Sequence, residues 1–355
     1  MTVRIGMIGG GMIARVHAKA IAETGGRIVA VFDAVQTKAQ SFAEEVGCEI
    51  EGSLEGLLRR DDVDAVVIAV PNDEHAPTAI ASIEHGKHVL LEKPMATSLD
   101  ACDAVLAARD NSDRILQLGF VCRYAPASVA ARRLIADGAI GSIHHVRATL
   151  LRQRGIPGLG GWFTQKTRSG GGCLIDIGVH LIDLVQFLTE PGRAKRASGH
   201  CSSLFGGDSY VYDDMWSEPH PGGVFDVEDS IRATVHFASG LRLDLDVAWA
   251  THLPEGVVSD GIVLQGDLGA MSLDIWGDEL LLGWAEEGRP ERRVESIDVS
   301  DAWDDAFVGE HRAFAEAIDT RQQPVAGGEA GRSVQAIVEA IYESDRRKKE
   351  VAIVN

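Results

Sequence analysis

The 355-residue chain is poor in cysteine and in positive charge. Its five cysteines are scattered and form no C-x-x-C pair, which argues against a disulfide framework or a zinc site and indicates reduced thiols. Lysine and arginine number 34 against 53 aspartates and glutamates, for a net charge of −19. This excess of negative charge disfavours nucleic acids and anionic membranes as partners. No clustered set of ligands argues for a metal.

We also expect neither a secretory leader nor an apolar run of membrane-spanning length, which takes about 20 residues. The first strand-like run, VRIGMIG, begins at residue 3, so we expect no leader ahead of it. We therefore expect a cytoplasmic protein with no membrane partner. A length of 355 residues favours two domains, and a hydrophobic fraction of 45% supplies ample core.

The first 120 residues alternate strand patterns with helix patterns. Predicted strands cover 3–9, 27–33, 48–50, 64–70, 88–94 and 115–120, and predicted helices cover 12–23, 34–46, 74–84 and 99–110. Ser53 is a plausible N-cap for a further short helix. The run DAVVIAV is apolar after its first residue, as expected for a parallel strand that is covered on both faces. This alternation predicts βαβ units and a doubly wound parallel sheet of the Rossmann type.

A glycine-rich turn joins the first predicted strand to its helix. The sequence GGGMIA at 9–14 fits G-x-G-x-x-A, in which the first glycine permits a tight turn and the second admits a pyrophosphate. Asp33 ends the second strand, where an acidic residue accepts hydrogen bonds from ribose hydroxyls and repels a 2′-phosphate. This favours dinucleotide binding over an empty glycine turn, and NAD over NADP. The expected cofactor contacts are Gly9, Gly11, Met12, Ile13 and Asp33.

The pattern changes after residue 120. A helix near 126–136 precedes predicted strands at 143–151, 197–205, 229–238, 241–249, 261–265, 270–275 and 279–284, and helices near 305–320 and 331–348 follow. The pair of runs at 229–249 alternates apolar with polar residues, which predicts an antiparallel hairpin with one apolar face. We expect a Rossmann domain over 1–122 and an α+β domain with an open, mainly antiparallel sheet over 123–355. We also expect the C-terminal helix to pack back on the first domain.

An open sheet of this size needs a cover or a partner subunit. We therefore expect a homodimer or homotetramer that assembles through the C-terminal sheet, which would make 123–355 both a substrate-binding and an oligomerisation domain.

The stretch SGGGCLIDIGVHLID at 169–183 predicts a helix that is apolar nearly all round. Its exceptions, Asp176, His180 and Asp183, fall within about 60° of one another on a helical wheel. Buried carboxylates and imidazoles need partners, and an aspartate one turn away can orient a histidine for acid–base work. Two interpretations stay open here, a capped core helix with satisfied polar groups and a catalytic helix.

Two loops carry weaker patterns. The loop 152–172 mixes seven glycines with Trp162, Phe163 and basic residues that include Arg168, which suits a lid over a polar ligand or a plain surface excursion. The segment 208–229 is acidic and aromatic. It borders either the substrate cleft or an interface, or it is a solvated loop.

Five segments in a fixed order carry a family resemblance. They are GGGMIA with Asp33, AVPNDEH at 69–75, EKP at 92–94, GFVCRY at 119–124 and GGGCLIDIGVHLID at 170–183. Together they resemble the glucose–fructose oxidoreductase/inositol dehydrogenase (Gfo/Idh/MocA) family over essentially the whole chain. The resemblance implies a Rossmann domain, a C-terminal α/β domain with an open sheet, and a nicotinamide cofactor in a dimer or tetramer.

The resemblance also implies roles for matching residues. Lys93 of EKP, Asp176 and His180 correspond to the catalytic set. Further cofactor contacts are implied at Val70, Pro71, Asn72, His75, Glu92 and Lys93. Substrate contacts are expected from Lys93, Arg123, Tyr124, Trp162, Arg168, Asp176 and His180, with Trp162 stacking on a sugar ring. Relatives have a cis peptide bond before the EKP proline. The sequence alone does not decide whether the Lys93-Pro94 bond is cis or trans.

The chemistry can be stated from the residues alone. Oxidation of a secondary alcohol by hydride transfer needs a base for the hydroxyl proton and a cation near the developing oxyanion. His180 held by Asp176 suits the first task and Lys93 the second, although a desolvated Lys93 could instead carry the proton. We expect an NAD-dependent dehydrogenase of a sugar, sugar derivative or cyclitol. The alternatives are a glycosidase that retains NAD and oxidises transiently, an NADP-dependent sugar ketone reductase, and a non-enzymatic NAD sensor.

Overall fold

A computed structural model of the chain describes residues 2–254 and 260–354. It divides into two compact units. Unit 1 comprises Met1–Phe120, Thr167–Gly170 and Phe307–Gln335, and unit 2 comprises Val121–Lys166, Gly171–Ala306 and Ala336–Asn355. The first passage between units lies near the expected boundary at 122. The later segments join unit 1 because residues such as Phe314 and Ala317 lie in its hydrophobic core.

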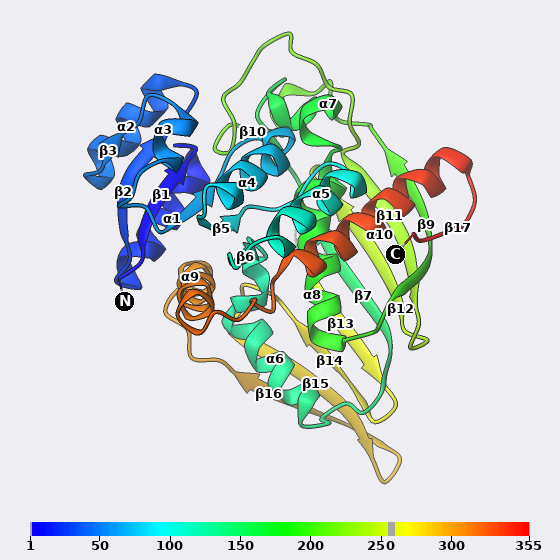
Figure 1. The fold of residues 1–355 in the computed structure, drawn as a ribbon. Helices are drawn as coiled ribbons and strands as arrows, with labels where there is room; N and C mark the ends of the chain where they lie inside the picture. The colour runs from blue at the N-terminus through cyan, green and yellow to red at the C-terminus, as the bar shows by residue number, and fades with distance from the viewer. Residues whose placement is uncertain (1, 255–259, 355) are drawn as a thin grey trace. The chain divides into compact units, whose positions relative to one another are not determined.

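Unit 1 contains a six-stranded parallel sheet in the order β3-β2-β1-β4-β5-β6 (Figure 1). Its strands are β1 (Arg4–Ile8), β2 (Arg27–Phe32), β3 (Glu49–Ile50), β4 (Ala65–Ile68), β5 (His88–Leu91) and β6 (Leu116–Leu118). All four residues of β4 are buried, as the apolar run predicts. The strand order reverses between β1 and β4, the place where doubly wound sheets bind dinucleotides beyond the carboxyl ends of their strands.

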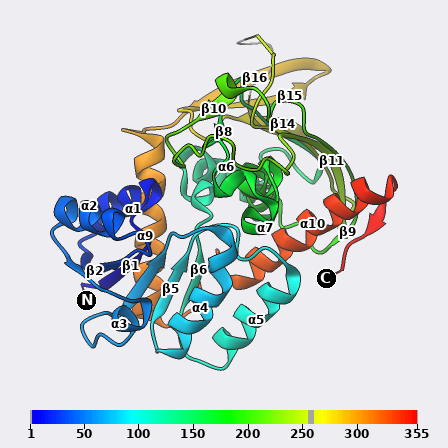
Figure 2. The ribbon, with the colours of Figure 1, turned by 90° about the horizontal axis from the view of Figure 1, so that it is seen from above.

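Helices alternate with these strands. They are α1 (Met12–Glu23), α2 (Gln36–Val46), α3 (Leu54–Leu58), α4 (His75–Glu84) and α5 (Leu99–Asp110). Figure 2 shows α4 and α5 side by side, and α4 contacts β4 and β5. Ser53 caps α3 by accepting a hydrogen bond from the Gly56 N–H at 3.0 Å, as expected. The doubly wound parallel sheet predicted from the alternation is confirmed.

The edge of the parallel sheet at β6 is paired by a later part of the chain. Leu118 N–H donates to the Ala326 carbonyl at 2.7 Å, and Gln117 forms an antiparallel bridge with Gly327. These residues precede α10 (Gly328–Arg347) and follow α9 (Ala302–Thr320), two helices that begin or end within unit 1. An exposed strand edge invites pairing with another chain, and this return of the chain covers it.

Unit 2 contains a nine-stranded mixed sheet in the order β16-β15-β14-β13-β7-β12-β11-β9-β17. Its strands are β7 (Ile143–Leu151), β9 (Ala194–Ser202), β11 (Ser230–Phe237), β12 (Arg242–Ala248), β13 (Gly261–Gly266), β14 (Gly269–Leu273), β15 (Glu279–Glu286), β16 (Arg289–Ser296) and β17 (Val351–Ala352). Only the β7–β12 pair is parallel among the pairs described in this sheet. The open, mainly antiparallel sheet and the β11–β12 hairpin are confirmed.

Helices α6 (Pro126–Ala136) and α8 (Val179–Thr189) pack on this sheet (Figure 1). The alternating residues of β11 and β12 bury one face, led by Val235 and Leu243. The opposite face carries polar side chains that pair with each other, as where Asp244 accepts from Thr234 at 2.7 Å. The β11–β12 hairpin therefore has the one apolar face that the sequence predicts.

Three expectations need correction. The strand expected at 197–205 is β9, which starts and ends three residues earlier, and β8 (Ile156–Pro157), β10 (Tyr212–Asp213), β16 and β17 were not expected. A π-helical turn, Leu174–Gly178, precedes α8. The angle predicted between Asp176 and the later polar residues assumed a regular α-helix, so it does not apply. The stretch Lys166–Thr189 is also long and apolar enough to cross a membrane, although 83% of its apolar window is buried inside the protein, as in a core helix.

Candidate active site

The turn between β1 and α1 has the backbone that a dinucleotide site requires. Gly9 has a φ of 100°, and a Cβ there would lie 2.2 Å from the Ala69 carbonyl oxygen, so only glycine fits. A Cβ on Gly11 would meet nothing within 4 Å. Gly11 stands at the N-cap of α1 with no side-chain cap, where helix N–H groups and the helix dipole favour an anion. Ala14 is fully buried, as the small last position of the motif requires.

Asp33 follows β2 beside this turn. Its carboxylate accepts hydrogen bonds from the backbone N–H groups of Gly10 at 2.8 Å and Val35 at 2.7 Å. These bonds fix the carboxylate at the carboxyl end of β2, next to the glycine turn. The glycine turn, the open space at Gly11 and this carboxylate fit the adenosine half of NAD.

The carboxyl ends of β4 and β5 are joined by a buried histidine. His75 Nδ1 lies 2.6 Å from the Pro94 carbonyl oxygen and Nε2 lies 2.9 Å from the Val70 carbonyl oxygen. Burial lowers the pKa of His75, and the hydrogen bonds to the two carbonyl oxygens oppose that change. His75 thereby fixes the backbone of Val70 and of the EKP turn relative to each other.

The EKP turn itself follows β5. The bond between Lys93 and Pro94 is cis. The Lys93 N–H donates to one carboxylate oxygen of Glu92 at 3.0 Å, and the other oxygen lies 2.9 Å from His17 Nε2. The backbone N–H of Glu92 donates to the Ile68 carbonyl at 3.0 Å, which ties the turn to the end of β4. Lys93 thus stands at the carboxyl end of a parallel strand, where ligands of such sheets bind.

The short segment Thr167–Gly170 is held in unit 1 by the turn after β4. The Asn72 side-chain amide donates to the Ser169 carbonyl at 2.8 Å, and Arg168 pairs with Asp73 at 3.1 Å. The sequence predicts Asn72 as a cofactor contact and Arg168 as a substrate contact. The structure shows that both also anchor this segment.

The glycines before the DIGVH helix are required by packing inside unit 2. A Cβ on Gly171 would lie 2.0 Å from the Tyr342 hydroxyl oxygen, and one on Gly172 would lie 1.8 Å from the Glu228 carbonyl oxygen. The Glu228 carboxylate accepts from the N–H groups of Gly172 at 3.0 Å and Leu174 at 3.1 Å and from the Tyr342 hydroxyl at 2.9 Å. A carboxylate at this position caps the helix start.

Burial raises the pKa of Glu228, against the hydrogen bonds that lower it. Glu228 and Tyr342 are the site residues that sequence reasoning missed. Glu228 lies in the acidic segment 208–229 for which the sequence offered no single interpretation, and the only available hint was an acidic residue ahead of a strand.

The polar residues of the DIGVH segment have different partners. Asp176 is buried, and its carboxylate accepts a hydrogen bond from the Trp249 indole N–H at 2.8 Å. His180, the second residue of α8, is partly exposed. The orientation of His180 by Asp176 stays a prediction, because the π turn changes the angle between their positions.

Asp183 forms a buried ion pair with Arg123. The guanidinium donates to both carboxylate oxygens, at 2.7 and 2.6 Å, and stands 5.1 Å from the Phe187 ring centroid. Burial raises the pKa of Asp183, although the guanidinium opposes the rise. The sequence predicts Arg123 and the adjacent Tyr124 as substrate contacts. In the structure Arg123 fastens α8 to the turn at Val121–Tyr124.

The glycine-rich loop of unit 2 is tied to the acidic segment. β8 pairs with β10, and the Arg154 guanidinium donates to the Tyr212 carbonyl at 3.0 Å. Trp162 stacks on Phe163 with ring centroids 3.8 Å apart. The two loops that the sequence treats separately therefore form one substructure, and Trp162 stands within it.

Two family models match this chain. Residues 3–120 match the one described as an oxidoreductase family with an NAD-binding Rossmann fold, and residues 128–272 match the GFO/IDH/MocA C-terminal domain. The chain belongs to the Gfo/Idh/MocA family. The resemblance carried by the five sequence segments is thus confirmed, and so are the oxidoreductase class and NAD as cofactor.

The names of several relatives describe oxidoreductases of sugars and cyclitols. The chain is 30% identical over 342 residues to 1,5-anhydro-D-fructose reductase of Ensifer adhaerens, covering 92% of each chain. It is 27% identical over 352 residues to D-glucoside 3-dehydrogenase of Escherichia coli (strain K12), covering 96% of this chain and 95% of that one. A solved structure of levoglucosan dehydrogenase with NADH and levoglucosan has a TM-score of 0.86 at 23% identity and covers both chains completely, which supports the fold.

Proposed function

We propose that this Gfo/Idh/MocA protein is an NAD-dependent dehydrogenase that interconverts a secondary hydroxyl and a ketone on a sugar, sugar derivative or cyclitol. The observation that carries the proposal is the placement of Lys93 at the carboxyl end of β5, in the half of the parallel sheet that begins at β4. The names of relatives such as D-glucoside 3-dehydrogenase and inositol 2-dehydrogenase support the substrate class.

The proposed mechanism assigns separate tasks to Lys93 and His180. Lys93 of unit 1 orients the reacting oxygen and stabilises negative charge on it. His180 of unit 2 takes the hydroxyl proton, with Asp176 and its Trp249 partner fixing the start of the helix that carries it. Bound NAD supplies the hydride acceptor. Gly9, Gly11, Met12, Ile13 and Asp33 would hold the adenosine and pyrophosphate, and Val70, Pro71, Asn72, His75 and Glu92 would shape the nicotinamide side.

The remaining substrate contacts follow from charge and ring chemistry. Trp162 offers an aromatic face and Arg168 a cation to a polyhydroxylated ligand. Tyr124 continues the turn that contains Arg123. Because the Arg123 guanidinium is bound by Asp183, we propose that it acts on substrate through the position of α8.

The proposal is tested by Lys93→Ala and His180→Ala. Each change removes a group that acts on the reacting oxygen, so we expect NADH formation from a responsive sugar or cyclitol to fall about 10²–10⁴-fold. NAD affinity, measured by calorimetry, should stay within a few-fold of wild type. If both side chains act on one oxygen, the double variant should lose much less than the product of the single losses.

Surface variants provide the control. Lys195→Ala on β9 and His144→Ala on β7 remove exposed residues of the same types and should leave turnover unchanged. Near-normal turnover in either active-site variant would contradict the assignment. Glycoside cleavage with no net NADH would instead indicate a glycosidase that oxidises its substrate transiently.

We also propose that the protein is cytoplasmic and that it forms a homodimer or homotetramer through the sheet of unit 2. Two exposed apolar residues that pair across the outer strands, Leu281 on β15 and Val294 on β16, support assembly there. Gel filtration should give a mass above that of the 38.0 kDa chain. A monomer at micromolar concentration would exclude this arrangement.

A further inference from the structure

A row of buried titratable groups runs through unit 1 behind the EKP turn. Glu92 Oε1 lies 2.9 Å from His17 Nε2, and His17 Nδ1 lies 2.9 Å from His311 Nε2. The three residues come from the end of β5, from α1 and from α9, and they are only 7%, 0% and 3% exposed. The proposed reaction uses neither histidine. Burying such groups costs free energy unless they have hydrogen-bond partners.

Hydrogen-bond chemistry limits the row to two arrangements. A carboxylate only accepts, so His17 Nε2 carries a hydrogen and donates to Glu92. His17 Nδ1 then either accepts from a hydrogen on His311 Nε2 or carries a second hydrogen and donates to His311 Nε2. The arrangements differ by one proton on His17. Burial and the neighbouring His17 ring hold the pKa of His311 well below its ordinary value, so His311 is neutral in both.

An aromatic ring and a buried glutamate lie near the row. The Phe307 ring contacts His17 edge-on at 5.3 Å and brings no charge. Glu310 on α9 is fully buried, and its two carboxylate oxygens have no hydrogen-bond partner in the described part of the chain. Burial and the Glu92 carboxylate raise the pKa of Glu310 well above its ordinary value. Among the described residues, His75 on α4 interacts electrostatically with Glu92 and with Lys93, whose backbone N–H also donates to Glu92.

The far end of the row meets a small pocket. His311 lines a pocket of about 40 Å³ together with Thr24, Gly25 and Gly26 in the turn between α1 and β2. A cavity needs roughly 10–15 Å³ to hold one water, so this pocket accommodates water. Gly25 is exposed at the surface. His311 Nε2 faces His17, so the exchange proposed below assigns the pocket water to Nδ1.

We propose that Glu92, His17 and His311 together bind one exchangeable proton for the nicotinamide site. They bind this proton to a greater extent when NADH is bound than when NAD is bound. The proton exchanges with solvent through the pocket at the α1–β2 turn. His17 and His311 are thus positioning residues that act through Glu92. The inference rests on the proposed function in one respect, the placement of Glu92 beside the nicotinamide.

The proton movement balances at each atom. A water in the pocket, recharged from solvent, gives a proton to His311 Nδ1, and the hydrogen on His311 Nε2 moves to His17 Nδ1. His17 is then a cation that donates to Glu92 and to His311, and His311 is again neutral. Release follows the same path in reverse, so no ring has to turn over.

The charge of the nicotinamide sets the direction. The ring is cationic in NAD and neutral in NADH, and both the cation and the His17 proton are stabilised by the Glu92 carboxylate. When the ring is neutral, the carboxylate holds the proton on His17 more tightly. By linkage, binding of NADH should take up more proton than binding of NAD, and lower pH should favour NADH over NAD.

The test is calorimetry of NAD and NADH binding to the full chain in two buffers with different ionisation enthalpies, from pH 6 to 9. We expect NADH binding to take up more proton than NAD binding, by up to one proton. The ratio of the NAD to the NADH dissociation constants should then rise with falling pH, by at most about tenfold per pH unit.

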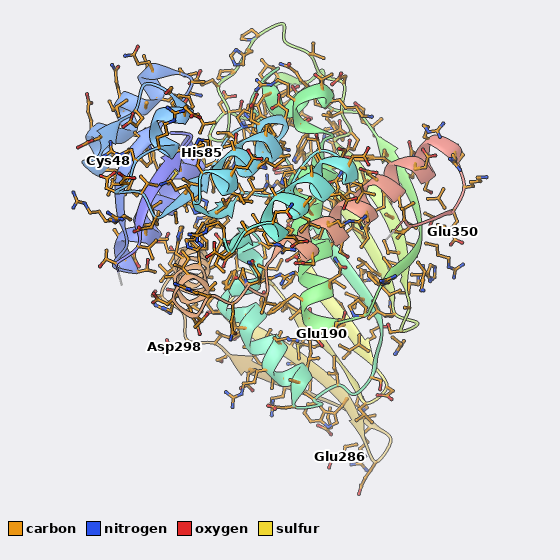
Figure 3. The ribbon with its side chains drawn as sticks, in the orientation of Figure 1. Cys48, His85, Glu190, Glu286, Asp298 and Glu350 are labelled. Atoms are coloured by element: carbon orange, nitrogen blue, oxygen red, sulfur yellow. The ribbon has the colours of Figure 1, made fainter. Side chains whose placement is uncertain are left out.

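His17→Gln should remove this difference, because glutamine can donate to Glu92 but does not titrate. The matched control is His85→Gln, since His85 forms an exposed histidine–glutamate pair with Glu55 at 3.3 Å in the same unit and is labelled in Figure 3. It should keep the wild-type difference, as should Glu310→Gln. His311→Leu should keep the equilibrium difference but slow the proton uptake that a pH indicator follows after mixing with NADH.

Histidine nitrogen chemical shifts of the wild-type protein give the same answer without a variant. His17 should show two protonated nitrogens to a greater extent with NADH than with NAD. Equal proton counts and equal His17 shifts for the two cofactors would overturn the proposal. Glu92→Gln separates this failure from a failure of the proposed function. If Glu92 lies beside the nicotinamide, the variant changes the ratio of NAD to NADH affinity, and if it leaves the ratio unchanged, the placement of Glu92 itself is wrong.

Discussion

The two units hold their candidate functional residues in different ways. In unit 1 these residues stand at the carboxyl ends of parallel strands, and backbone conformation fixes them, as at Gly9 and at the EKP turn. In unit 2 the proposed acid–base pair, Asp176 and His180, stands on one helical segment that is held by side chains from distant parts of the sequence. Trp249 binds Asp176, Arg123 binds Asp183, and Glu228 binds the helix start.

This difference indicates where each unit is vulnerable. A parallel sheet places its strand ends at one edge by topology, so unit 1 depends on glycines and turn geometry. Unit 2 depends on buried pairs of polar groups, each of which is costly when one partner is missing. The predictions below test this contrast.

The largest stability loss is expected for Asp183→Ala in unit 2. The change leaves the Arg123 guanidinium buried without its carboxylate, both side chains being less than a tenth exposed, and should lower the free energy of unfolding by about 3–5 kcal/mol. Chemical denaturation measures the loss. The control is the surface pair of Arg196 with Glu350, of which Glu350 is labelled in Figure 3, and Glu350→Ala should cost less than about 1 kcal/mol. Equal losses for the two variants would remove the contrast between buried and exposed pairs.

Substitutions at two glycines of unit 1 should distinguish an effect on stability from an effect on NAD affinity. Gly9→Ala forces a side chain into a positive φ and against the Ala69 carbonyl, so it should lower stability by about 1–3 kcal/mol or more and weaken NAD binding as well. Gly11→Ala meets no atom in the protein, so its melting temperature should be unchanged. NAD affinity of that variant should still fall about tenfold, a loss of about 1.4 kcal/mol, because the methyl group takes the space of a close pyrophosphate. Unchanged affinity in Gly11→Ala would place the pyrophosphate elsewhere.

A smaller effect of opposite sign is expected for Glu310→Gln in unit 1. Burial raises the pKa of Glu310 in the folded protein, so folding favours the protonated form and wild-type stability falls as pH rises above the ordinary glutamate pKa of about 4.3. Glutamine stays neutral and avoids this loss. The variant should therefore melt at a higher temperature than wild type near pH 8, and the difference should vanish below about pH 4. A gain that is the same at all pH values would exclude titration as its cause.

The contrast between the units also explains what the sequence could predict. The bounds of α1, α5, α6 and β7 follow from apolar periodicity and local breakers, and the structure has them where the sequence predicts them. The glycine turn and Asp33 are predictable because their spacing along the chain is itself the motif.

The supports of the DIGVH helix could not be predicted. Glu228 lies 56 residues from Gly172, and Tyr342 lies 114 residues from Glu228. No local pattern marks such partners, because what selects them is the absence of a Cβ at Gly171 and Gly172. The π turn before α8 could not be predicted either, because an apolar run has the same composition in an α-helix and in a π-helix.

The pairing of β6 with residues 326–327 limits which fragments of the chain retain the contacts of unit 1. A fragment that ends at Phe120 would lose both this edge pairing and the contribution of Phe314 and Ala317 to its core. Chain passages at Lys166–Thr167, Gly170–Gly171, Ala306–Phe307 and Gln335–Ala336 add further connections between the units. A single recombination event between genes could therefore not exchange one unit for that of a relative, and the nucleotide-binding unit is inherited together with the sequence that follows it.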